Sequence, residues 1–231
     1  MPDILSFDAI TDGNADLVGG KGLGLGRTAA AGLPVPSGFV VTTQAFRRLA
    51  DRGVRSDREF TRRLLDAYRD LGGGPVAVRS SATAEDATDT SFAGQQETIL
   101  GVEGDDRLVE AVERCWRSLF TERAEAYRER QGVAAAGLAM AVVVQRLVPA
   151  DAAGVLFTRD PTDPTGETML AEGSWGLGEA VVSGRVQPDR FKLDRTTGAV
   201  REKHLGLKSV RVTPAGEEHV PPADQQQFCL S

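Results

Sequence analysis

The sequence has few of the residues that form disulfides and metal centres. Among its 231 residues there are only two cysteines and two histidines. Cys115 and Cys229 lie far apart and show no paired spacing, so we expect reduced thiols and no disulfide. With so few sulfur and imidazole groups, the composition argues against a dedicated Cys/His metal site, and we predict no metal-ligating residue in this chain.

Long apolar runs and an excess of basic residues are also missing. The most apolar strand-like stretch, Ala139–Val148, is about half of the ~18 residues that span a bilayer. The first residues carry acids and no basic region before an apolar core, which argues against secretion. The net charge of −6 disfavours non-specific nucleic-acid binding. We therefore expect a cytoplasmic protein that binds neither membrane nor nucleic acid. Its charge balance is still compatible with a small anionic ligand.

The hydrophobic fraction of 41% predicts a packed globular protein. Ser56-Asp57-Arg58-Glu59 fits a helix capping box, and Thr197-Gly198 fits a hairpin turn. Apolar periodicity predicts helices over 23–31, 43–52, 58–71 and 105–131, and strands over 39–42, 76–79, 140–148, 154–158, 168–172, 190–194 and 200–203. A turn over 149–153 is expected to join the third and fourth of these strands. This irregular mixture favours an α+β fold over a doubly wound sheet.

Two common nucleotide-binding motifs do not fit. A Walker A loop requires Gly-x4-Gly-Lys-Ser/Thr, but Gly20-Lys21 is followed by Gly22, and Ala15 stands where the first glycine would be. Gly24-Leu-Gly26-Arg-Thr-Ala29 satisfies a loose dinucleotide pattern, but no credible strand leads into that turn.

Glycines surround the first candidate residue, Lys21, in Gly19-Gly20-Lys21-Gly22-Leu23-Gly24. Glycines let the backbone approach a ligand closely, and the lysine ammonium can then reach phosphate oxygens. The alternative is a flexible helix start with a solvated lysine.

The second candidate, Arg79, ends a buried strand and precedes Ser80 and Ser81. A guanidinium at the end of a buried strand is costly unless an anionic group pairs with it. Fifteen residues later, Gly94 lies among small residues whose N–H groups can form an anion-binding turn. The alternative is a surface hairpin in which Arg79 pairs with Glu85, Asp86 or Glu97.

Polar residues in two later segments complete the candidates. Gln145 lies within an apolar strand and must satisfy its amide, either on an adenine edge or on a neighbouring backbone group. Glu172 and Glu179 flank a strand end, a glycine-rich turn and a short helix. These carboxylates fit ribose hydroxyls or a cation, but they also fit simple capping roles.

Together, these segments resemble the N-terminal nucleotide-binding domain shared by phosphoenolpyruvate synthase, pyruvate phosphate dikinase and rifampin phosphotransferase. The resemblance extends from Val18 to about Val212, with the motifs in the family's order and spacing. The matching strings are Val18-Gly-Gly-Lys-Gly, Gly32-Leu-Pro-Val-Pro-Ser-Gly-Phe, Val78-Arg-Ser-Ser-Ala-Thr-Ala-Glu-Asp, Ser91-Phe-Ala-Gly-Gln-Gln-Glu-Thr, Gly154-Val-Leu-Phe-Thr and Gly176-Leu-Gly-Glu.

The resemblance implies an ATP-grasp-like domain over residues 1–231, with approximate lobes 1–75 and 76–231 that close over the nucleotide. It assigns Lys21 and Arg79 catalytic contacts with the ATP phosphates and places Gly94 in the loop over them. Thr98 would touch the nucleotide, and Gln145 would lie beside the adenine. Glu172 and Glu179 are further nucleotide-binding candidates that map less securely, and Lys208 lies in another family-like segment without an assigned role.

The resemblance also implies what lies outside this sequence. In the family, the chain continues into segments that carry the Mg²⁺ ligands, and we expect this C-terminal end to be truncated before them. The phosphoryl-accepting histidine domain and the acceptor-substrate domain would be partners in cis in a parent protein or in trans. His204 and His219 are expected to be surface residues.

The implied function is ATP binding, with Mg²⁺, for dikinase-type phosphoryl transfer. The β-phosphoryl would pass to a histidine and then to pyruvate or an antibiotic hydroxyl, with release of AMP and phosphate. The chain would be the nucleotide-binding part of such a phosphotransferase. The alternative is a non-catalytic protein that keeps the fold as a nucleotide sensor or a partner-binding module.

Overall fold

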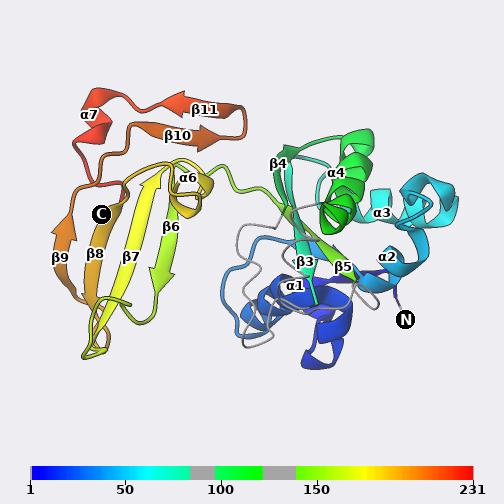
Figure 1. The fold of residues 1–231 in the computed structure, drawn as a ribbon, viewed down its shortest axis with the longest axis horizontal. Helices are drawn as coiled ribbons and strands as arrows, with labels where there is room; N and C mark the ends of the chain where they lie inside the picture. Colours follow the sequence, from blue (N-terminus) through cyan, green and yellow to red (C-terminus); the bar gives the residue numbers. More distant parts are fainter. Residues whose placement is uncertain (1, 84–96, 122–138, 231) are drawn as a thin grey trace. The chain divides into compact units, whose positions relative to one another are not determined.

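The computed structural model describes residues 2–83, 97–121 and 139–230. The chain forms two compact units, Met1–Leu147 and Val148–Ser231, shown in Figure 1. This division differs from the expected lobes 1–75 and 76–231. The strand that begins at Val76 pairs with a strand that ends at Arg146, and that strand in turn pairs with one from before residue 75.

The first unit is built on a five-stranded sheet of order β1-β2-β5-β3-β4. All of its neighbouring strands pair antiparallel. The strands are β1 (Ile4–Ser6), β2 (Gly38–Val41), β3 (Val76–Ala82), β4 (Thr98–Val102) and β5 (Met140–Arg146). The predicted strands over 39–42, 76–79 and 140–148 are thus confirmed, and β3 runs three residues further than expected.

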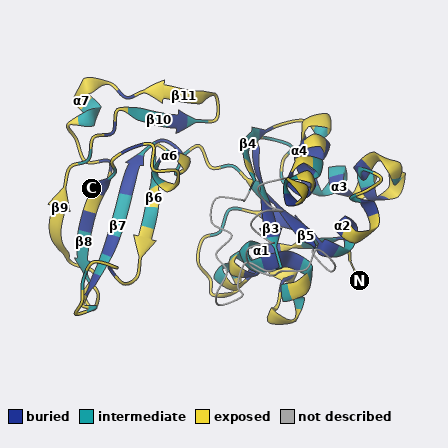
Figure 2. Cartoon of the chain, in the orientation of Figure 1, coloured by how far each residue is buried: buried dark blue, intermediate teal, exposed yellow. Residues whose placement is uncertain are grey.

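Helices cover both faces of this sheet, because the sheet buries apolar side chains on both. Val41, Val78 and Val142 share one cluster with side chains of α2 (Thr43–Leu49), α3 (Arg58–Asp70) and α4 (Asp105–Arg117). Val40 and Val143, on the opposite face, pack with α1 (Ala15–Ala30). Short 3-10 helices occupy Phe7–Ala9, Asp12–Asn14, Val54–Ser56 and Ser118–Phe120. Figure 2 shows the resulting buried centre.

Two details of the predicted helices are wrong. Asp57, not Ser56, caps α3, since its carboxylate accepts from the Phe60 N–H at 3.0 Å while the Ser56 hydroxyl donates to the Gly53 carbonyl. The helix expected over 105–131 ends at Arg117 and gives way to the 3-10 turn, and residues 122–131 of that prediction lie outside the described residues. In the 3-10 turn, the Ser118 hydroxyl donates to the Cys115 carbonyl at 2.7 Å, a local bond that competes with helix continuation.

The second unit contains a four-stranded antiparallel sheet of order β6-β7-β8-β9. Its elements are β6 (Ala152–Phe157), β7 (Thr168–Trp175), α6 (Glu179–Val182), β8 (Asp189–Asp194), β9 (Val200–His204), the hairpin β10 (Val210–Thr213) and β11 (Gly216–His219), and α7 (Pro222–Gln225). The predicted strands and the hairpin at Thr197-Gly198 are confirmed. The strands on either side of residues 149–153 belong to different sheets.

One face of this second sheet is covered by the last residues of the chain. Phe191 on β8 lies 5.5 Å from Phe228, centroid to centroid, and Gly173 on β7 lies beside Cys229 and Leu230. The amide of Cys229 donates to the buried Asp189 carboxylate at 2.7 Å. Both cysteines are buried free thiols.

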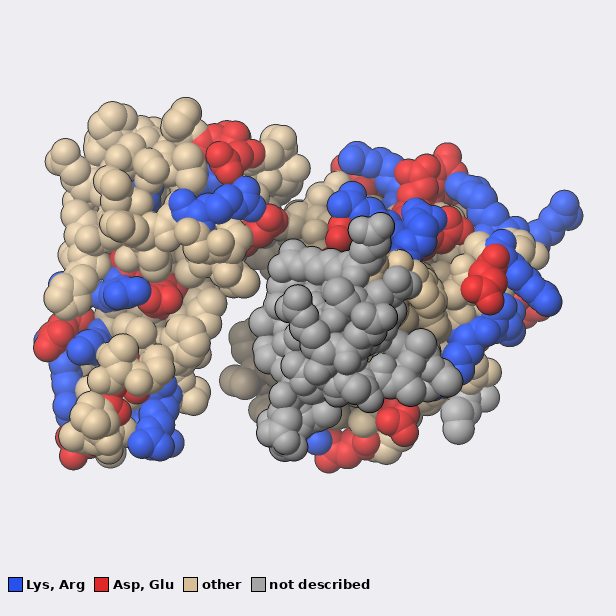
Figure 3. Space-filling view, viewed as in Figure 1, with Lys and Arg blue, Asp and Glu red and all other residues tan. Residues whose placement is uncertain are grey.

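Charges of both signs are interleaved on the face drawn in Figure 3. Oppositely charged surface residues form pairs, such as Arg69 with Asp105 and Arg185 with Glu217. Within the described ranges, no helix is long and apolar enough to pass through a membrane.

Candidate functional site

The segment around Lys21 is a helix broken at Gly19. Gly19 has φ 67° and ψ 176°, so α1 consists of two helical pieces that meet at this residue. A Cβ at Gly19 would lie 2.5 Å from the carbonyl and hydroxyl oxygens of Ser81. One at Gly22 would lie 2.9 Å from the Cβ of Val18. Both glycines therefore allow the chain to pack closely against itself, a requirement that the sequence interpretation did not foresee.

Ser81 joins the two pieces of the broken helix to the sheet. Its hydroxyl donates to the Val18 carbonyl at 2.8 Å and accepts from the Gly22 N–H at 3.3 Å. The preceding Ser80 points to the other face, where its hydroxyl accepts from the Glu97 N–H at 3.0 Å. The two Ser81 bonds hold both pieces of α1 against β3, and the Ser80 bond holds the residue before β4 against the same strand.

Lys21 reaches β3 directly, since its ammonium donates to the Ser80 carbonyl at 2.8 Å. The adjacent Arg79 is half-buried on β3, opposite Thr98 on β4 and Val143 on β5. Directly paired residues point to the same face of a sheet. Val143 packs in the cluster under α1, so Arg79 and Thr98 are on the face that α1 covers.

Gln145 also lies on this face, two residues beyond Val143 on β5. The structure therefore gathers four sequence-predicted residues, Lys21, Arg79, Thr98 and Gln145, on the α1 side of one sheet. The Gln145 amide nitrogen donates to the Pro36 carbonyl at 3.1 Å, as the backbone alternative anticipated. Its amide oxygen has no hydrogen bond to any described residue, and Thr98 is exposed.

Of the carboxylates that were alternative partners for Arg79, the structure describes only Glu97. The Glu97 carboxylate pairs with Arg114 at 2.5 Å. Glu85, Asp86 and the predicted phosphate-loop residue Gly94 lie outside the described residues.

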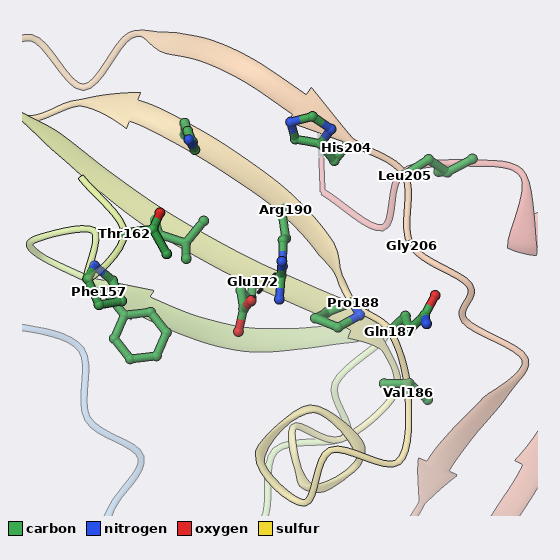
Figure 4. A pocket seen from close by; sticks show the side chains of 13 residues that line it. Phe157, Thr162, Glu172, Val186, Gln187, Pro188, Arg190, His204, Leu205 and Gly206 are labelled. Carbon is green, nitrogen blue, oxygen red and sulfur yellow. Dashed lines mark hydrogen bonds and ion pairs between the residues drawn. The ribbon is translucent and has the colours of Figure 1, made fainter. Parts of the chain in front are cut away.

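Glu172 and Glu179 have separate surroundings in the second unit. Glu172 on β7 pairs with Arg190 Nε at 2.8 Å and lines a pocket with it, seen in Figure 4. Glu179 is the exposed first residue of α6 and pairs with Arg185 at 2.5 Å. These different partners give the two carboxylates distinct local roles.

Lys208 has a structural position that the sequence did not reveal. Its side chain is fully buried, and its ammonium lies 2.5 Å from Asp189. Within the described ranges, no group of three or more His, Cys, Asp or Glu side chains is placed to hold a metal ion.

Comparison with known proteins shows which family the chain resembles. The family described as "Pyruvate phosphate dikinase, AMP/ATP-binding domain" matches residues 15–59 and 53–231. A probable phosphoenolpyruvate synthase of Methanocaldococcus jannaschii is 37% identical over 90% of this chain, and one of Archaeoglobus fulgidus is 40% identical over 92%. A rifampicin phosphotransferase of Streptomyces sviceus is 37% identical over 97%.

These relatives are much longer than the chain. The aligned region covers 21% of the Methanocaldococcus protein, 33% of the Archaeoglobus protein and 30% of the Streptomyces protein. The chain thus spans at most about a third of these relatives.

Proposed function

Because the chain belongs to the family of pyruvate phosphate dikinase AMP/ATP-binding domains, we propose that it binds ATP with Lys21 and Arg79 on the phosphates. The observation that carries this proposal is the contact of the Lys21 ammonium with the Ser80 carbonyl, next to Arg79. It brings two cationic side chains, far apart in sequence, to the same strand end. Two such cations neutralise the charge of a polyphosphate.

The local backbone supports the same assignment. The second piece of α1 begins just after Gly19, so Lys21 lies in its first turn, where N–H groups and the helix dipole favour an anion. Thr98, opposite Arg79, offers a hydroxyl to the nucleotide. Gln145 would face the adenine with its amide oxygen, to which no described residue donates, and the Gly94 turn would close over the phosphates. In the second unit, Glu172 and Glu179 remain candidate nucleotide contacts.

The proposed reaction is dikinase-type phosphoryl transfer within an ATP-grasp-like domain. The β-phosphoryl of ATP would pass to a histidine on another domain and then to pyruvate or an antibiotic hydroxyl, with release of AMP and phosphate. Mg²⁺ would neutralise the phosphates during transfer. The histidine and acceptor domains would act in cis or in trans, in the cytoplasm.

Calorimetric titration with ATP tests the phosphate contacts. Arg79→Ala should abolish measurable ATP binding, because the guanidinium contributes charge-assisted hydrogen bonds to the phosphates. Arg27→Ala is the matched control, since Arg27 lies on α1 but pairs with Asp12 on the surface. Unchanged ATP affinity in Arg79→Ala, with an unaltered melting temperature, would overturn the proposal.

A second measurement tests whether phosphoryl transfer needs a histidine on another domain. The isolated chain incubated with ATP and Mg²⁺ should release no AMP, because the phosphoryl-accepting histidine is assigned to another domain. AMP formation by the chain alone would contradict that assignment. ATP binding without AMP formation, even after the family's histidine domain is added, would favour the nucleotide sensor instead.

A further inference from the structure

The open face of the second sheet carries a pocket that the proposed phosphate contacts do not use. Its volume is about 780 Å³, and all of its lining residues fall between Phe157 and Gly206. Figure 4 shows Glu172 and Arg190 side by side at its centre, with Phe157 and Thr162 to one side and Pro188 to the other. The pocket therefore belongs to the second unit alone.

The strand register places the polar groups of the pocket in two rows. Glu172 on β7 is opposite Arg190 on β8, which is opposite His204 on β9. In the next row, Lys192 on β8 is opposite Glu202 on β9. Since opposed residues share a face, these side chains all lie on the open side of the sheet.

Arg190 presents a free hydrogen-bonding edge to this pocket. Its Nε donates to Glu172 Oε1 at 2.8 Å, which fixes the plane of the guanidinium. The two terminal nitrogens have no hydrogen-bond partner in the part of the chain that the structure describes. Such a planar pair of nitrogens matches the two oxygens of a carboxylate in a bidentate contact.

The surrounding charges limit the ligand to a single negative charge. Arg190 already has Glu172 beside it, and Lys192 lies 4.0 Å from both Asp160 and Glu202. Three carboxylates therefore surround two permanent cations. A polyphosphate would meet strong repulsion here, whereas one carboxylate can bind at the outer edge of Arg190.

The rest of the pocket wall is largely apolar. Leu170 and Val186 are buried side chains beneath it, and Phe157, Pro188 and Leu205 border it. Phe157 and Leu205 are partly exposed, at 40% and 48%, so an apolar body laid against them would remove their surface from water.

We propose that this pocket binds a small monocarboxylate with an apolar body, whose carboxylate pairs with the terminal nitrogens of Arg190. This site shares no residue with the proposed phosphate contacts Lys21 and Arg79, and in it Glu172 orients Arg190 instead of contacting the nucleotide. The probe is 3-phenylpropionate, which has one carboxylate and an apolar ring, titrated into the full chain and followed by amide NMR shifts.

In the wild-type chain, 3-phenylpropionate should shift amides of β7, β8 and the Leu205–Gly206 segment in a saturable manner. Arg190→Ala should weaken binding by about tenfold or more, the effect of losing one charge-assisted contact. Arg190→Lys should weaken it less, because the charge remains but the paired nitrogens are lost. Arg201→Ala is the matched control, an arginine of β9 that pairs with Asp194 and does not line the pocket.

Three further probes separate the parts of the ligand. Acetate lacks the apolar body and 3-phenylpropan-1-ol lacks the charge, so each should bind at least tenfold more weakly than 3-phenylpropionate. AMP should give no comparable shifts at these amides. Stronger shifts there with AMP, equal affinity for the alcohol, or unchanged 3-phenylpropionate affinity in Arg190→Ala would each overturn the proposal.

The Arg79→Ala variant distinguishes this proposal from the ATP assignment. It should lose ATP binding but retain wild-type affinity for 3-phenylpropionate. Loss of 3-phenylpropionate binding in a folded Arg79→Ala chain would contradict an independent site in the second unit.

Discussion

The two units of the chain are stabilised in different ways. In the first, helices cover both faces of the sheet, and two clusters of buried apolar side chains fix their positions. In the second, the interior includes the buried ion pair of Lys208 and Asp189, and one sheet face carries the pocket. Among the described residues, neither large apolar cluster extends into the second unit.

This difference shows where each unit is most sensitive to substitution. In the first unit, apolar packing and close backbone contacts place Lys21 and Arg79, so steric changes should disturb them most. In the second, Asp189 accepts from Lys208, from the Gly206 N–H at 2.8 Å and from the Cys229 N–H. One carboxylate thus connects three segments, and loss of its charge partner should disturb them together.

The largest expected effect is from Lys208→Ala, which tests the polar interior of the second unit. Removing the ammonium leaves the Asp189 carboxylate buried without its counter-charge, which typically costs about 3–5 kcal/mol. Urea unfolding should show this loss. Arg195→Ala, an exposed arginine of the same unit, is the control and should change stability little. A Lys208→Ala chain as stable as the wild type would contradict the distinction between the units.

Gly19→Ala tests the steric interior of the first unit. The left-handed φ costs a non-glycine residue about 1–2 kcal/mol, and crowding against Ser81 adds roughly 1–3 kcal/mol. Gly24→Ala is the matched control, because no atom lies within 4 Å of its Cβ position and alanine favours the helix. We expect thermal unfolding to show a large loss for Gly19→Ala and none for Gly24→Ala; equal melting temperatures would be evidence against the close contact.

The smallest expected effect is a dependence on acidic pH. Burial raises the pKa of Asp189, but hydrogen bonds from Lys208 and the Gly206 and Cys229 amides outweigh it and hold the pKa below its usual value. This stabilisation is present above the ordinary aspartate pKa and is lost as the pH falls through the lowered one. Between pH 6 and pH 3, urea unfolding should show a greater loss of stability for the wild type than for Asp189→Asn. Equal losses would indicate that Asp189 does not contribute to the acid response.

Much of the fold could be predicted from local patterns in the sequence. Alternating and periodic apolar residues gave most strands and the helix with Phe60, Leu64 and Tyr68 buried. The helix predicted from Asp105 ends earlier than expected, at Arg117, and the two compact units divide after Leu147 instead of near residue 75. A hydroxyl–carbonyl bond and long-range strand pairing decided these two points. Ser81 and Lys208 contact residues that are distant in the sequence, and no local sequence pattern indicates these contacts.

By itself, the sequence determined the α+β character, the family, and the four candidates Lys21, Arg79, Thr98 and Gln145, because motif order and residue chemistry are local properties. Only the tertiary structure decided that these four share one face of a sheet, since strand register over long chain separations sets which side chains lie together. It also decided that the two cysteines, scarce from the outset, are buried, where loss of solvation raises the pKa of each thiol to about 12.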